Sequence, residues 1–142
     1  MKQPPQLKVT FFRVKDSGAK IRLICSKALD AYQKEKRLLI AVPNSESAQY
    51  VDSLLWRLPE ESFMPHLISD VPSNEWIVIT LQDKENVNGA ARLLNLCTDP
   101  SPLYQFVEEV YELYDETHPQ KLELSQQRMR LYQSKGFQVS IA

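Results

Sequence analysis

The chain has 142 residues, a mass of 16.4 kDa and a formal charge of -1, with 43% hydrophobic and 25% charged residues. This near-balanced charge argues against a protein that coats nucleic acid, because such domains carry a large positive excess. No apolar run approaches the roughly 18 residues that a membrane span requires. The first five residues lack the apolar core of a signal peptide. We therefore expect a cytoplasmic protein.

The sequence contains no repeat, low-complexity tract or linker, so we expect one compact domain over residues 1–142. Its two cysteines, Cys25 and Cys97, lie far apart in apolar segments. Thiols in such segments behave as small core residues, and we expect both to be reduced rather than joined in a disulfide.

Hydrophobic spacing and capping residues predict an alternation of strands and helices along the chain. The run Leu38–Val42 is apolar without alternation, which is typical of a strand buried on both faces of a parallel sheet. In chain order the predicted elements are a strand over Leu7–Val14, a helix from Ala19 to about Lys36, a strand over Leu38–Val42, a helix from Ser45 to Pro59, strands over Trp76–Leu81 and Ala91–Cys97, a helix from Ser101 to about Tyr114, a helix from about Pro119 to Lys135 and an extended tail from Phe137. This order predicts a three-layer α/β fold with a mostly parallel sheet and about four helices.

The third predicted helix begins at Ser101-Pro102, since serine caps a helix and proline suits its first turn. Helical spacing then directs one set of residues to the core and an acidic set to solvent. The acidic set is Glu108, Glu109, Glu112, Asp115 and Glu116, and we interpret it as a solvated face rather than a cation site. His118-Pro119 begins the last helix, where a capping role for the histidine is expected.

The fingerprints of catalysis are missing. The first strand-to-helix turn, Asp16–Lys20, fits neither phosphate-binding pattern, GxxxxGK[ST] or GxGxxG. No serine or cysteine lies in a nucleophile elbow, and the scattered histidines and cysteines lack metal-ligand spacing. We therefore expect no catalytic residue, metal or cofactor. An α/β enzyme that binds a nucleotide or small ligand at an unrecognised site remains the alternative.

Two segments carry large or charged residues that a simple core does not explain. The first ends a helix and enters a loop, and its candidate partner-binding residues are Trp56, Phe63, Met64 and Pro65. Aromatic residues and methionine are enriched at interfaces, although a loop also packs its own apolar groups against the body. Both interpretations stay open from these residues alone.

The second segment is the last helix and the residues after it, where cations surround apolar side chains. Its candidate binding residues are Lys121, Arg128, Met129, Arg130, Tyr132, Lys135 and Phe137. The cations could simply oppose the negative end of the helix dipole. A basic rim around an apolar floor also suits an acidic peptide with a hydrophobic terminus, and direct binding of single-stranded DNA is a third reading.

With these residues in view, the chain resembles the chi subunit family of bacterial DNA polymerase III. The most specific likeness is an LLIAV strand followed by LLWRLPEESFMPH, in which Trp56, Pro59, Ser62, Phe63, Pro65 and His66 match the family's motif at fixed spacing. The ending RMRLYQSKGF is similar to the family's arginine-rich last helix. The likeness covers the whole chain in order and length.

The resemblance implies a Rossmann-like fold without nucleotide chemistry and a role as an adaptor in replication. One surface, carrying Trp56 and Phe63, would bind the psi subunit of the clamp loader, or a helicase. The last helix, with Arg128, Arg130 and Tyr132, would bind the acidic, phenylalanine-ended tail of single-stranded DNA-binding protein. The chain would then contact DNA only indirectly.

The last helix departs from the family pattern at three positions. Gln126, Gln127 and Gln133 stand where the family often has basic residues. The resemblance therefore implies weaker tail binding here, or binding that depends more on Lys121 and Lys135.

Overall fold

The computed structural model describes residues 6–57 and 64–142. The strands in this part are β1 (Lys8–Val14), β2 (Leu38–Ala41), β3 (Leu67–Ile68), β4 (Ile77–Thr80), β5 (Arg92–Asn95), β6 (Glu109–Asp115) and β7 (Gln138–Ile141). The helices are α1 (Ser17–Gln33), α2 (Ser45–Arg57) and α3 (Pro119–Ser134), with a 3₁₀ helix η1 (Pro102–Phe106). The predicted elements thus lie close to their expected places, apart from the third helix.

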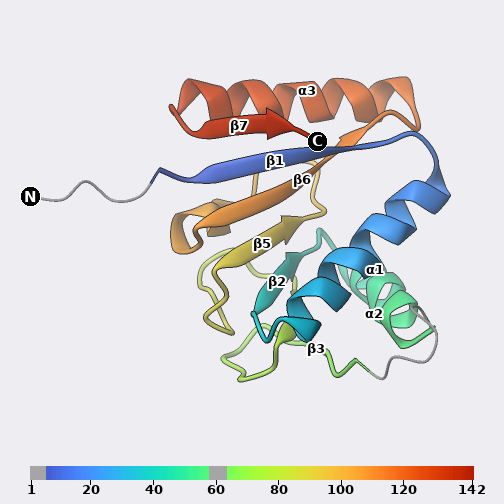
Figure 1. Cartoon of the computed structure of the whole chain (residues 1–142), viewed down its shortest axis with the longest axis vertical. Coiled ribbons are helices and arrows are strands. Elements are labelled where there is room, and N and C mark those ends of the chain that lie inside the picture. Colours follow the sequence, from blue (N-terminus) through green and yellow to red (C-terminus); the bar gives the residue numbers. More distant parts are fainter. Residues whose placement is uncertain (1–5, 58–63) are drawn as a thin grey trace, which may run out of the picture.

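The strands form one sheet in the order β3-β4-β2-β5-β6-β1-β7, and every pair is parallel. Helices α1 and α2 lie side by side on one face, and α3 lies along the opposite face near β1 and β7 (Figure 1). The predicted three-layer α/β architecture is confirmed. The described part has three α-helices rather than the expected four.

Two apolar clusters hold the layers together. All four residues of β2 are buried, with Leu38 and Ile40 packing toward α1 and α2 and Leu39 packing toward the face that α3 covers. This explains why the strand is apolar without alternation, as expected for a parallel sheet with both faces covered. The strand β4 is buried in the same way.

Side-chain caps begin all three α-helices of the described part, and the cap of α3 is the predicted histidine. The Asp16 carboxylate accepts a hydrogen bond of 2.7 Å from the Ala19 amide and begins α1. At α2 the side chain of Asn44 accepts from the Ser47 amide at 2.8 Å, and at α3 the ring of His118 accepts from the Gln120 amide at 3.3 Å. Gly136 follows α3 with φ of 79°, a left-handed conformation that glycine adopts without strain.

The predicted helix from Ser101 to Tyr114 is wrong. The Ser101 hydroxyl caps η1 as expected, but η1 ends at Phe106 and the chain then forms strand β6. That strand pairs along its full length with β1 and also with β5. The sequence pattern fits both the helical and the strand period, and this tertiary pairing decides for the strand. Because both faces of this strand are covered, Glu112 lies buried beneath α3 and Asp115 is buried on the opposite face, contrary to the predicted solvated face.

Both cysteines are free thiols, as predicted, with Cys25 buried and Cys97 half-buried. Among the described residues, no helix is both long and apolar enough to cross a membrane.

Candidate functional site

The cationic residues of α3 divide into exposed and buried sets. Lys121, Arg130 and Lys135 are exposed, and Met129 and Phe137 are half-buried against the core beneath the helix. The helix thus keeps three positive side chains in solvent with apolar surface beside them.

Arg128, in contrast, points into the protein. Its Nε donates to the Glu112 carboxylate at 3.0 Å. Its terminal nitrogens donate to the carbonyl oxygens of Thr98 and Leu113 at 3.0 and 3.1 Å, and to the Ser125 hydroxyl at 3.2 Å. The prediction that Arg128 lies on the binding surface therefore needs correction, because strand β6 supplies a buried carboxylate that the sequence pattern had placed in solvent.

The Glu112 carboxylate is the centre of this buried network. It accepts hydrogen bonds from the Tyr132 hydroxyl at 2.6 Å and from the Asn95 side chain at 2.8 Å, in addition to Arg128. Burial raises the pKa of Glu112, while the charge of Arg128 and the hydrogen bonds act in the opposite direction. Burial also raises the pKa of Tyr132, and the neighbouring Glu112 adds to this effect. Each member of the network is paired, so the network fixes α3 on the sheet.

Tyr132 is fully buried, so its predicted place at the floor of an open pocket also needs correction. Its ring lies 6.1 Å from the Phe11 ring, 6.4 Å from the Tyr104 ring and 6.4 Å from the Phe137 ring, centre to centre. The Tyr132 ring therefore packs against other rings of the protein, where the sequence had predicted contact with a ligand. Of the three predicted apolar residues of this segment, Met129 and Phe137 keep part of their surface exposed.

The second candidate surface lies at the end of α2. Trp56 is 49% exposed, and its ring contacts the His66 ring at a tilt of 47° with centroids 4.2 Å apart. His66 is held in place, since its Nδ1 lies 2.9 Å from the Met64 carbonyl oxygen and its Nε2 lies 3.0 Å from the Asp52 carboxylate. Met64 is fully buried in the core, so its predicted place on the partner-binding surface needs correction, while Pro65 is half-buried. Phe63 lies outside the described residues.

A cavity of about 180 Å³ opens at the carboxyl edge of the sheet, between Lys20, Cys97, Lys121 and Arg128. Ligands of α/β proteins often bind at this edge. Burial raises the pKa of the Cys97 thiol to about 11, with the Glu112 charge adding to the effect, so the thiol stays protonated and weakly nucleophilic at neutral pH. Among the described residues, no group of three or more histidine, cysteine or acidic side chains could hold a metal ion.

Asp115 at the rim of this cavity makes stability depend on pH. Burial raises its pKa, but hydrogen bonds from Thr117 and from Lys20, at 2.9 Å, outweigh burial and hold the pKa below its ordinary value. The carboxylate therefore stabilises the fold above the unfolded pKa of about 3.9, and this contribution is lost as pH falls through the folded pKa. We expect the difference in unfolding free energy between wild type and Asp115→Asn to be constant above about pH 5 and to narrow as the pH falls from there through the unfolded pKa toward the lower folded pKa. A difference that stays constant in urea denaturation over this range would contradict the assignment.

Comparison with known proteins decides the family. Residues 7–140 match the family described as "DNA polymerase III chi subunit, HolC". The chain belongs to the DNA polymerase III chi subunit family. DNA polymerase III subunit chi of Escherichia coli (strain K12) is 28% identical over 125 residues, which cover 85% of this chain and 83% of the relative. The resemblance seen in the sequence is thus confirmed.

A solved structure, that of T4 UvsW, is similar with a TM-score of 0.62 at 11% sequence identity. The match covers 96% of this chain but only 40% of the longer UvsW chain. At this identity the likeness shows the fold alone, a layered α/β arrangement that hosts many functions.

In this chi-family chain, the sequence did not reveal which strands flank α3. Arg13 on β1 places its guanidinium 5.3 Å from the centre of the Tyr114 ring, and the Tyr114 hydroxyl accepts a hydrogen bond of 3.1 Å from Gln126 on α3. Arg13 and Gln126 therefore contact the same tyrosine, and Arg13 also pairs with Glu116 at 3.3 Å. No local signal links β1 to β6, so Arg13 could not be placed here from the sequence.

Proposed function

We propose that this chain is a non-catalytic adaptor of the bacterial replicative DNA polymerase III. It links the clamp loader, through the psi subunit or an equivalent partner, to the acidic C-terminal tail of single-stranded DNA-binding protein. The family match over residues 7–140 carries this proposal. Two separate candidate surfaces in the described part of the chain support it.

The two surfaces lie at opposite ends of the sheet. Helix α2, which carries Trp56, packs on β3 and β4 at one end, and α3 packs on β6 and β7 at the other (Figure 1). An adaptor needs such separation, because its two partners must bind at the same time. The rigid parallel sheet between them holds the partners at a fixed distance.

The surface at the end of α2 is proposed to bind psi, or a helicase that uses the same site. Its anchor is Trp56, whose exposed indole is held over His66. Pro65 adjoins it, and the buried Met64 supports the chain from the core side. Tryptophan dominates the binding energy of many interfaces, because a partner can bury its large surface at low entropic cost.

The surface along α3 is proposed to bind the acidic tail. Lys121, Arg130 and Lys135 supply charge, and Met129 and Phe137 supply apolar contact for a terminal phenylalanine. Each exposed ion pair adds only about 0–1 kcal/mol, and burial of a phenylalanine ring adds about 1.5–3 kcal/mol. After the cost of ordering the tail, we expect micromolar affinity that falls as salt is added.

A pull-down with purified single-stranded DNA-binding protein tests the tail interaction. We expect this chain to capture the full-length protein and not a version that lacks its C-terminal tail. Titration of a labelled tail peptide should also give weaker binding when the last phenylalanine is removed. Equal capture of the full-length and truncated proteins would overturn the proposed partner site.

A further inference from the structure

The amino edge of the sheet carries a row of charged residues that the proposed function does not use. Strand pairing aligns six residues across neighbouring strands: Gln138, Lys8, Glu109, Arg92, Leu38 and Ile77. Lys36 and Arg37 immediately precede this row at β2, and Trp76 precedes it at β4. Parallel pairing therefore brings cations from three strands and a tryptophan to one edge, although they are far apart in sequence.

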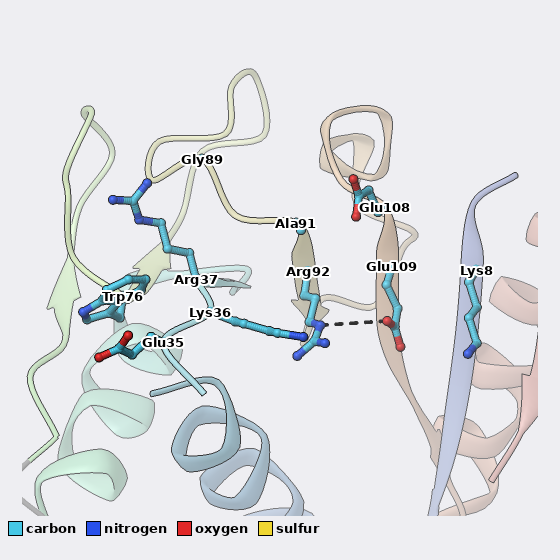
Figure 2. Close-up of a pocket in the computed structure, with 10 residues that line it drawn as sticks. All are labelled: Lys8, Glu35, Lys36, Arg37, Trp76, Gly89, Ala91, Arg92, Glu108 and Glu109. Atoms are coloured by element: carbon cyan, nitrogen blue, oxygen red, sulfur yellow. Dashed lines mark ion pairs between the residues drawn. The ribbon is translucent and has the colours of Figure 1, made fainter. Parts of the chain in front are cut away.

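A cavity of about 620 Å³ opens at this edge, and its lining includes Lys8, Lys36, Arg37, Trp76, Arg92 and Glu109. Figure 2 shows Lys36 extending toward Arg92, while Arg37 turns toward Gly89. The guanidinium of Arg37 also lies 5.4 Å from the centre of the Trp76 ring. The positively charged side chains of Lys36 and Arg92 thus approach each other at the cavity. A bound anionic ligand would reduce the repulsion between them.

The acidic residues of the edge neutralise these cations only in part. Arg92 Nε lies 3.9 Å from Glu109 Oε2, which is too long for a hydrogen bond. The buried Nε of Arg37 has no hydrogen-bond partner among the described residues. Lys8 and Lys36 are exposed and form no ion pair within the described part of the chain. The cavity therefore offers several positive groups to a partner.

The same edge includes the end of the α3 surface. The Gln6 side-chain amide donates to the Gly136 carbonyl oxygen, and Lys8 lies opposite Gln138 in the sheet register. Lys135, one of the exposed cations of α3, directly precedes this turn. The cations of the cavity and the cationic end of α3 thus follow one another along one side of the molecule.

We propose that an acidic peptide in an extended conformation lies along this amino edge, from Lys135 and Lys8 to Lys36 and Trp76. The inference rests on the proposed function and deepens it, since the peptide is the segment that precedes the tail bound at α3. Five steps between strands of about 4.8 Å each give a span of roughly 24 Å, the length of about seven extended residues. The partner must therefore carry acidic residues over a longer stretch than the α3 surface alone could contact.

The charges of the edge favour a peptide over a nucleic acid. Glu35, Glu108 and Glu109 lie among the cations and would repel the regular phosphates of a DNA strand. A peptide can place uncharged residues beside these carboxylates and acidic residues beside the cations. Arginine and tryptophan, present here as Arg37 and Trp76, are also the residues most enriched where proteins bind proteins.

Fluorescence anisotropy with a labelled Asp-Gly repeat peptide, long enough to span the edge, tests the inference. We expect Lys36→Glu to weaken binding about three- to tenfold, since it reverses one exposed charge of the cavity. Glu108→Gln should tighten binding by about twofold, because it removes an exposed like charge from the path. Lys15→Glu is the matched control: it makes the same charge change at an exposed lysine beyond the opposite end of β1, and it should have little effect.

The outcomes separate this inference from the proposed function. Weakening by Arg130→Glu but not by Lys36→Glu would leave the α3 surface in place and overturn the edge path. Equal weakening by Lys36→Glu and Lys15→Glu would show only a response to net charge and would also overturn it. Loss of oligo(dT) binding in Lys36→Glu, without loss of peptide binding, would assign the edge to DNA instead. The tail-dependent pull-down could fail while Lys36→Glu still weakens binding of the peptide. This result would overturn the proposed partner and leave the edge as a site for acidic peptides.

Discussion

Replacing Arg128 by alanine is expected to lower the free energy of unfolding by about 3–5 kcal/mol. The change leaves the Glu112 carboxylate, which is fully buried, without its 3.0 Å ionic partner. It also removes the donors to the carbonyl oxygens of Thr98 and Leu113. Urea denaturation followed by circular dichroism measures the loss. A shift of the transition midpoint without a change of slope would show that stability alone has changed.

Arg130→Ala is the matched control, because Arg130 lies two residues away on α3 and is exposed. It should change stability by no more than about 0.5 kcal/mol. The double variant Glu112→Leu with Arg128→Met should recover part of the lost stability, because no unpaired carboxylate stays buried, while the buried Tyr132 hydroxyl loses its acceptor. If Arg128→Ala were as stable as Arg130→Ala, the buried pair would not exist and Arg128 would again be a candidate for tail binding.

The sequence predicted most of the fold because its signals are local. The apolar run at β2 and the capping residue His118 each act within a few residues, and each lies where it was expected. Strand β6 was missed for the opposite reason. Its residues fit a helical and an alternating pattern about equally, and pairing with β1, about a hundred residues earlier, decides between them.

The same mistake explains the errors at the candidate site. Once β6 is interpreted as an exposed helix, nothing in the sequence supplies an internal partner for Arg128 or Tyr132, so both seem free to bind a ligand. In the structure Glu112 pairs with both. The row of charges at the amino edge was missed because strand order cannot be deduced from spacing, and Lys36 and Arg92 come together only through that order.

Trp56→Ala is expected to weaken binding to psi by about 2 kcal/mol or more, which is roughly thirtyfold. Trp56 is half-exposed in the isolated chain, so a partner can cover the rest of its surface. The ring is also pre-positioned by its contact with His66, which is held by Met64 and Asp52, so little order has to be gained on binding. Isothermal titration with purified psi measures the effect.

Tyr50→Ala is the control for Trp56→Ala, because Tyr50 is an aromatic residue on the same helix with a similar exposure of 52%. Six positions along α2 turn its side chain well away from that of Trp56, so its loss should leave psi affinity almost unchanged. Both variants should keep the wild-type free energy of unfolding to within about 1 kcal/mol, since neither side chain is buried. Equal affinities for psi in the two variants would show that the surface at the end of α2 does not bind psi. A large loss of stability in Trp56→Ala would instead show that the indole serves the fold through its contact with His66.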